Sequence, residues 1–339
     1  MRKLKFFDST LRDGSHAIKQ RLLKEYIVSY CKAIDSAGFY TVIIGHGNGL
    51  GASSIQMGLS AIDELEMVKT ASENLDKTKL GTFVTVGFGT VKEHIIPAIK
   101  LGTSIFCIAS HCTEADTMKK HIEFLSRQGK EVYGVLMNCH LADKNILLEQ
   151  AKKIESYGAD GVILMDSAGA LTPVKVKDTV SMLRQNTSLE IGFHGHNNMS
   201  MAVANTFVAI QNGASIVDGT VLGFGAGAGN CQIEAIVALL EKEGINTKIN
   251  LYTVLDAAKN VIRDMIGYKN GIDGTCIISG YAGVVSTFKQ RVEEVAKRFN
   301  LDPRDIFIEL GKRKAIAGQD DLILQVAKEQ AFLIPPQNE

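Results

Sequence analysis

The sequence predicts an α/β fold, a (β/α)8 TIM barrel, followed by a C-terminal helical domain. Short apolar runs alternate with segments of helical periodicity, and this alternation indicates βα units around a parallel sheet. Eight such runs are present, the number that closes a TIM barrel. A doubly wound sheet is the alternative. Because the alternation then stops, we expect a catalytic barrel domain at residues 1–248 and a helical domain at residues 249–339.

The predicted strands are rich in β-branched and aromatic residues, whereas the segments between them have the apolar spacing of amphipathic helices. The strands are expected at 4–8, 40–45, 80–86, 104–109, 131–137, 161–166, 189–193 and 215–219. Helices are expected at 22–37, 90–101, 113–128, 143–157, 173–185 and 199–212, and then at 251–266, 283–299, 303–313 and 319–331. Glycines such as Gly102 and Gly158 follow several of these segments, which is typical of helix ends.

The composition is that of an ordinary globular protein. Lys plus Arg and Asp plus Glu each number 37, which disfavours a nucleic-acid or anionic-membrane partner. No segment approaches the roughly 18 apolar residues that a membrane span needs. The six cysteines lack CxxC spacing, so a disulfide framework or a structural zinc site has little support. We therefore expect a soluble, cytoplasmic protein.

Polar residues follow the ends of the predicted strands, where the active sites of barrels lie. Among them, His194 and His196 are two apart on an extended segment, so both imidazoles face the same side and can converge on one metal ion. An acid such as Asp13 would complete a two-histidine, one-carboxylate set that leaves positions open for a substrate. The alternative is a pair of surface histidines that are hydrogen-bonded at a turn.

The first predicted strand is also followed by Arg12 and His16. A guanidinium suits the stabilisation of a developing oxyanion, and a histidine suits general acid/base catalysis because its usual pKa lies near neutrality. The alternative is an Arg12–Asp13 ion pair that closes the loop beside an incidental histidine.

Weaker candidates lie in other loops. The glycine-rich loop at 223–230 formally contains G-x-G-x-x-A, but it follows the last strand instead of opening a βαβ unit. We therefore expect its glycines to admit a ligand or to close the barrel, and not to bind a dinucleotide. His46, Asp166 and Ser167 are single polar residues after strands, and His111 could reach the barrel mouth.

Seven segments together carry a family resemblance. They are STLRDGSH (9–16), IGHGNGLGASS (44–54), ASHCTEAD (109–116), MDSAGALTP (165–173), GFHGHNNMSMAVAN (192–205), GTVLGFGAGAGN (219–230) and SGYAGVVSTF (279–288). The chain resembles the 4-hydroxy-2-oxovalerate aldolases, metal-dependent pyruvate aldolases of the TIM-barrel superfamily that includes HMG-CoA lyase. The similarity runs over nearly the whole chain.

The resemblance implies a metal site. It implies that Asp13, His194 and His196 hold a divalent metal, usually Mn²⁺, with Mg²⁺ or Co²⁺ as alternatives. The implied reaction is the reversible cleavage of a 4-hydroxy-2-oxo acid, such as 4-hydroxy-2-oxopentanoate, to pyruvate and an aldehyde, such as acetaldehyde. The metal would act as a Lewis acid on the incipient enolate.

The resemblance also implies roles for further residues. Arg12 would stabilise the pyruvate enolate, His16 would be the acid/base, and Tyr281 from the C-terminal domain would lie over the site. Ser167 and Asn230 resemble contacts to the substrate or to the residues that bind the metal. The family further implies an acylating acetaldehyde dehydrogenase as a partner, a setting in aromatic catabolism, and a C-terminal domain that contributes to the active site and to the partner interface. A homo-oligomer is a further expectation.

This chain departs from the family pattern near the expected mouth. Ile43 and Asn48 replace acidic residues, Phe83–Val86 replaces a Leu-rich run, and Ser200 stands where glycine is usual. These departures concern the aldehyde specificity more than the metal site, and a biosynthetic setting stays open. The competing functions are a carbon–carbon lyase or Claisen-type synthase acting on an acyl-CoA, which the HCTEAD and GYAG segments disfavour, and a non-catalytic barrel subunit.

Overall fold

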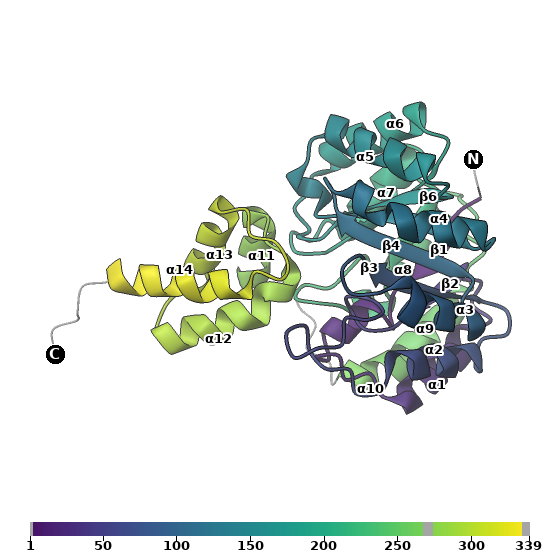
Figure 1. The fold of residues 1–339 in the computed structure, drawn as a ribbon, viewed down its shortest axis with the longest axis horizontal. Helices are drawn as coiled ribbons and strands as arrows, with labels where there is room; N and C mark the ends of the chain where they lie inside the picture. Colours follow the sequence, from purple (N-terminus) through teal and green to yellow (C-terminus); the bar gives the residue numbers. More distant parts are fainter. Residues whose placement is uncertain (1–2, 267–273, 334–339) are drawn as a thin grey trace.

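The protein is a closed barrel of eight parallel strands with a group of helices projecting from one side (Figure 1). The computed structural model describes residues 3–266 and 274–333. Strands pair in sequence order from β1 to β8, and β8 pairs with β1. They are β1 (Lys5–Asp8), β2 (Thr41–Ile44), β3 (Lys79–Thr85), β4 (Ile105–His111), β5 (Glu131–Met137), β6 (Gly161–Asp166), β7 (Glu190–Gly195) and β8 (Ile216–Gly219). The predicted fold class and all eight strands are confirmed.

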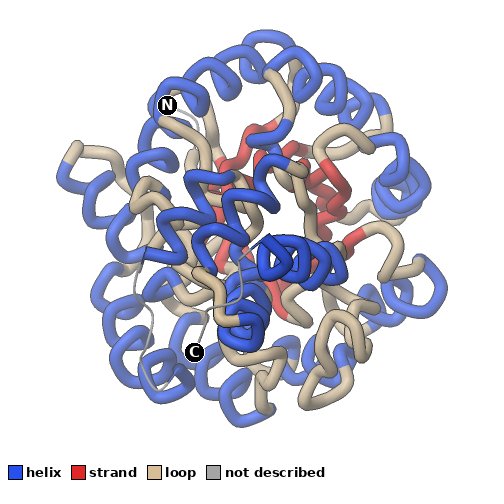
Figure 2. The backbone as a smooth tube through the Cα atoms, turned by 90° about the vertical axis from the view of Figure 1, so that its left-hand side faces the viewer, coloured by secondary structure: helices blue, strands red, loops and turns tan. Residues whose placement is uncertain are grey.

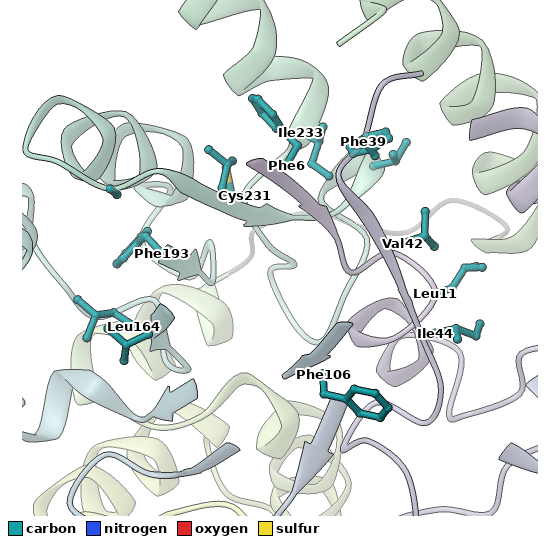
Figure 3. Packing of buried hydrophobic residues seen from close by; sticks show 14 of the residues in the cluster. Phe6, Leu11, Phe39, Val42, Ile44, Phe106, Leu164, Phe193, Cys231 and Ile233 are labelled. Carbon is teal, nitrogen blue, oxygen red and sulfur yellow. The ribbon is translucent and has the colours of Figure 1, made fainter. Parts of the chain in front are cut away.

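The alternation of side chains along each strand builds two cores, because successive residues point to opposite faces. Phe6, Val42 and Ile44 pack outward against the helices, in the cluster that Figure 3 shows in part. Phe7 and Ile43 point inward and fill the barrel interior. Ile43, one of the departures from the family pattern, is fully buried in this inner cluster.

Helices surround the barrel (Figure 2). The barrel helices are α1 (Lys24–Ile34), α2 (Glu64–Ser72), α3 (Ile96–Lys100), α4 (Lys119–Arg127), α5 (Lys144–Ser156), α6 (Pro173–Asn186), α7 (Ala202–Gln211) and α8 (Ile233–Lys242). The sequence analysis did not list α2 or α8. The start of α2 does carry a local signal, since the side chain of Asp63 accepts hydrogen bonds from the backbone N–H groups of Leu65 and Glu66. No helix in the described part of the chain combines the length and the apolarity needed to cross a bilayer.

The C-terminal segment divides between the two bodies seen in Figure 1. Helices α9 (Leu251–Ala257) and α10 (Arg263–Ile266) contribute to the barrel's outer hydrophobic cluster. A second cluster lies among α11 (Gly274–Ala282), α12 (Lys289–Phe299), α13 (Pro303–Lys312) and α14 (Asp320–Leu333). The helix predicted from residue 283 begins only at Lys289, because Gly283, with φ +72°, ends α11. The domain boundary at 248/249 stays a prediction, and the tail after Leu333 lies outside the described residues.

A buried asparagine joins the barrel to the projecting helices. Asn198, in the loop after β7, donates from Nδ2 to Ser279 Oγ over 2.7 Å, and its Oδ1 accepts from Ser286 Oγ over 2.6 Å. The side chain is only 1% exposed. The Asn198 carboxamide therefore fixes α11 and the 3-10 turn before α12 against the loop that carries His196.

Replacing this carboxamide should loosen the junction. In Asn198→Ala the buried Ser286 hydroxyl loses its acceptor, which costs about 1–3 kcal/mol of unfolding free energy. Urea denaturation measures that loss, and amide hydrogen exchange should accelerate in α11. Asn186→Ala, at an exposed helix end, is the matched control and should change stability by less than about 0.5 kcal/mol. Wild-type exchange in α11 of Asn198→Ala would show that the junction does not depend on this residue.

Candidate active site

A cavity of about 650 Å³ lies between the barrel mouth and the C-terminal helices. In Figure 2 the strands form the ring behind, and the projecting helices lie in front of it. The cavity is lined by loops that follow the carboxyl ends of the strands, together with α12 and the turn before α14. It contains Arg12, Asp13, His16, Ser167 and His196, so most of the predicted site residues meet at one place.

Asp13, His194 and His196 form one cluster. Each offers a ligand atom, and these atoms all lie within 4.8 Å of one another. All three side chains are buried. The alternative of two surface histidines at a turn is therefore wrong, because His194 has no exposure and His196 only 7%.

An acid lies beside His194. Its Nδ1 is 3.1 Å from Asp218 Oδ1, which also accepts a hydrogen bond from Ser9 Oγ over 2.7 Å. This contact with Asp218 does not have hydrogen-bond geometry, so neither ring nitrogen of His194 has a hydrogen-bond partner among the described residues. The same holds for His196 Nδ1. The sequence analysis gave Asp218 no role, since only the β7–β8 pairing brings it beside His194.

The carboxylate of Asp13 is held from two sides. Arg12 Nη1 donates to Oδ1 over 2.7 Å, and Asn230 Nδ2 donates to Oδ2 over 2.6 Å. Burial would raise the pKa of Asp13, but the Arg12 guanidinium and then the His196 imidazole more than offset it, so this pKa lies well below its usual range. Burial lowers the pKa of His196 to about 3. The cluster thus combines an ionised carboxylate with a neutral imidazole.

The glycine-rich loop is required by this arrangement. A Cβ at Gly225 would lie 2.1 Å from Asn230 Nδ2 and 2.8 Å from Asp13 Oδ2, so only glycine leaves room for their hydrogen bond. The loop therefore closes over the carboxylate, in agreement with the expectation that its glycines serve close approach.

Arg12 is buried and stacked. Its guanidinium carbon lies 4.5 Å from the ring centroid of Phe83, and Nη1 also donates to Gly47 O over 3.3 Å. Its Nε has no hydrogen-bond partner among the described residues. The ion pair with Asp13 expected as the structural alternative is present, and the same guanidinium lines the cavity, so the two interpretations of Arg12 are compatible.

His16 is held by Gln20, which the sequence analysis missed. Gln20 Oε1 accepts from the Gly47 backbone N–H over 2.8 Å, which fixes the amide so that Nε2 faces His16 Nδ1 at 3.1 Å. Nδ1 therefore accepts, which places the proton of the neutral ring on Nε2, and the ring also has a hydrogen bond to the Gly47 backbone. Burial lowers the pKa of His16, so the imidazole is neutral near pH 7.

Of the remaining predicted residues, two line the cavity and two do not. Ser167 lines the cavity and accepts from the Asn138 backbone N–H over 3.0 Å, and His111 lines it as expected. His46 lies outside the site, because its Nε2 is 3.0 Å from Gly58 O and its Nδ1 accepts from the Asn48 N–H. Tyr281 is 74% exposed and is not among the residues that line the cavity, so its role over the site stays a prediction.

The loop that carries Arg12 and Asp13 rests on a buried acid. Asp8 accepts from Tyr30 OH over 2.6 Å and from the backbone N–H of Thr10 over 2.9 Å. Thr10 Oγ1 in turn accepts from the Val221 N–H over 2.9 Å. The network ties β1 to α1 and to the loop after β8, and burial raises the pKa of Asp8 to about 6.

Comparison with known proteins identifies the family to which this barrel belongs. Residues 3–261 match the model of the HMGL-like family, and residues 270–331 match a DmpG-like communication domain. Among solved structures, the N-terminal domain of a putative aldolase from Bacteroides vulgatus aligns with a TM-score of 0.74 at 22% identity, covering 88% of this chain and 98% of that one. The carboxyl transferase domain of Rhizobium etli pyruvate carboxylase aligns with a TM-score of 0.81 at 15% identity, covering 97% and 61%.

Sequence relatives narrow the class. A 4-hydroxy-2-oxovalerate aldolase from Pectobacterium atrosepticum is 46% identical over 97% of this chain and 96% of its own length. One from Spirochaeta aurantia is 47% identical over 95% and 94%. The chain belongs to the 4-hydroxy-2-oxovalerate aldolase family, which confirms the resemblance.

The raised pKa of Asp8 predicts a pH-dependent stability. The pKa of Asp8 is about 6 in the folded protein, whereas an Asp in an unfolded chain has a pKa of about 3.9. Asp8 therefore contributes fully to the unfolding free energy below pH 4, and this contribution is lost as the pH rises through 6. Between pH 4 and pH 7 the titration of Asp8 should lower the unfolding free energy of the wild type by about 2–3 kcal/mol. Asp8→Asn should not show this loss, because Asn cannot ionise. Urea denaturation at the two pH values measures this difference. Asp116→Asn, an exposed control, should keep the wild-type slope, and an equal slope in Asp8→Asn would refute the titration of Asp8.

Proposed function

We propose that this protein is a divalent-metal-dependent aldolase. It reversibly cleaves a 4-hydroxy-2-oxo acid, such as 4-hydroxy-2-oxopentanoate, to pyruvate and an aldehyde such as acetaldehyde. Relatives of this name, 42–47% identical over nearly the whole chain, support the reaction. The observation that carries the proposal is the buried Asp13–His194–His196 cluster that opens on the cavity.

These residues fit a divalent cation. Buried ring nitrogens on both histidines have no partner among the described residues, and Asp13 is held ionised between two donors. Two imidazoles and one carboxylate suit Mn²⁺, with Mg²⁺ or Co²⁺ as alternatives. Bound there, the cation would supply Lewis-acid stabilisation of the charge that develops on the 2-oxo acid.

Two further side chains would carry the reaction. Arg12, whose Nε is unpaired, would bind the developing negative charge of the 2-oxo acid. His16 would move the proton of the 4-hydroxyl group, since it lines the cavity and burial keeps its ring neutral. Ser167 would contact the 2-oxo acid from the wall of the cavity, and Tyr281 would need to move to reach it.

The C-terminal helices suggest a partner. The match of residues 270–331 to a communication domain supports association with an acylating acetaldehyde dehydrogenase that would receive the aldehyde. Helix α12 and the turn before α14 line one wall of the cavity through residues such as Arg291 and Ile316. We propose that residues 249–339 serve both the site and this interface in a cytoplasmic, homo-oligomeric enzyme.

The metal assignment is tested with His194→Ala. Loss of one of three ligands should remove most bound Mn²⁺ and pyruvate-forming activity together, as measured by metal analysis and by release of pyruvate from 4-hydroxy-2-oxopentanoate. His94→Ala, which changes a half-buried histidine outside the cluster and the cavity, should retain both. A purified His194→Ala protein with the wild-type metal content would contradict the assignment, and turnover of an acyl-CoA by the wild type would favour the competing function.

The proton-transfer role is tested with His16→Ala. The variant should keep Mn²⁺ and pyruvate binding but lose roughly 10²–10⁴ in turnover, the range for one general acid/base. In the wild type the rate should fall at acidic pH as the His16 imidazole becomes protonated, and burial places this fall below pH about 6.5. This acidic limb of the pH–rate profile should disappear in His16→Ala. An unchanged limb would assign the proton transfer to another group in the cavity, such as His111.

A further inference from the structure

Asn138 is a buried residue of the cavity wall that the proposed reaction leaves without a role. It directly follows β5, lines the cavity and is 6% exposed. Its side-chain Oδ1 is buried and has no hydrogen-bond partner among the described residues. A buried carbonyl oxygen without a donor is costly, so it marks a position where a bound molecule can supply one.

The backbone holds this side chain in place. Asn138 has φ 56° and ψ 35°, the left-handed conformation that Asn tolerates better than most residues. Its N–H donates to Ser167 Oγ, and its carbonyl oxygen accepts from the Leu141 N–H over 2.9 Å and from Cys112 Sγ over 3.3 Å. Three contacts thus fix the main chain, and none of them uses the carboxamide.

The position of Asn138 relative to the metal cluster indicates which part of a ligand it meets. Asp13 follows β1, and in a closed barrel ordered from β1 to β8 the strand across from β1 is β5. A 4-hydroxy-2-oxo acid held by its 2-oxo acid end at Asp13 would extend its other end across the cavity. That other end becomes the aldehyde on cleavage.

The neighbouring polar side chains are already engaged. Thr85 Oγ1 donates to Asn48 O over 2.9 Å, and His111 Nδ1 lies 2.8 Å from Thr113 Oγ1. Met137 and Met165 supply the apolar part of this wall. Asn138 Oδ1 is thus a buried acceptor on this side of the cavity that no described residue occupies.

We infer that Asn138 is a specificity-determining residue that accepts a hydrogen bond from a hydroxyl group on the aldehyde-derived end of the substrate. The preferred product would then be a hydroxyaldehyde, in place of an alkyl aldehyde of the same size. This inference rests on the proposed aldolase function and names its substrate class.

The test compares two substrates that differ by one hydroxyl group in place of a methyl group. 4,5-Dihydroxy-2-oxopentanoate yields pyruvate and glycolaldehyde, and 4-hydroxy-2-oxohexanoate yields pyruvate and propanal. Pyruvate release is followed with lactate dehydrogenase and NADH for both. The wild type should favour the dihydroxy acid by about tenfold or more in kcat/KM, because a site built to pair a hydroxyl group rejects the analogue that lacks it.

Variants assign this preference to the side chain. Asn138→Gly, which adopts the same backbone conformation without strain, should bring the ratio of the two kcat/KM values close to one. Asn138→Asp keeps an acceptor and should retain the preference for the hydroxyl group. Asn300→Gly, which replaces another left-handed Asn at the end of α12, is the matched control and should keep the wild-type ratio.

The outcomes separate the two claims. A wild-type ratio near one, or an unchanged ratio in Asn138→Gly, would overturn the role of Asn138 while leaving the aldolase function intact. Absence of pyruvate from both substrates and from 4-hydroxy-2-oxopentanoate would overturn the proposed function, and the inference with it.

Discussion

The buried carboxylate of Asp13 is the group around which the barrel mouth is organised. An unpaired buried charge is expensive, and Arg12 and Asn230 offset that cost by donating to its two oxygens. Each donor imposes a further requirement. Arg12 needs the face of Phe83 beneath its guanidinium, and Asn230 needs a glycine at position 225. One carboxylate thereby fixes the loops after β1 and β8 against β3, which leaves His194 and His196 facing an anion.

The same mouth is coupled to the C-terminal helices. The loop that carries His196 continues to Asn198, whose carboxamide bonds to Ser279 and Ser286. The cavity lies between these two bodies, so its outer wall depends on that junction. Residues 270–331 match a communication domain. A partner that bound these helices would therefore contact elements that form one wall of the cavity.

Local patterns predicted the barrel and the metal cluster, since both follow from short-range periodicity. Short apolar runs between segments of helical periodicity predicted all eight strands, and the His194-x-His196 spacing places two imidazoles on one face. The pairings made by segments far apart in the chain were not predictable in this way. Asp218 reaches His194 through strand pairing. Asn138 could be singled out only from the structure, in which its side-chain Oδ1 is buried and has no hydrogen-bond partner among the described residues. Tyr281 belongs to the GYAG segment that the family resemblance rests on, yet its side chain is exposed to solvent. A sequence motif does not show how far a side chain is exposed.

The most direct test of the central claim is anomalous diffraction at the manganese absorption edge from crystals of the wild-type protein grown with Mn²⁺. The buried cluster predicts one strong anomalous peak in contact with Asp13, His194 and His196, at the end of the cavity that Arg12 lines. A map without a peak at this cluster, or with its strongest peak bound to other side chains, would contradict the assignment of these three residues.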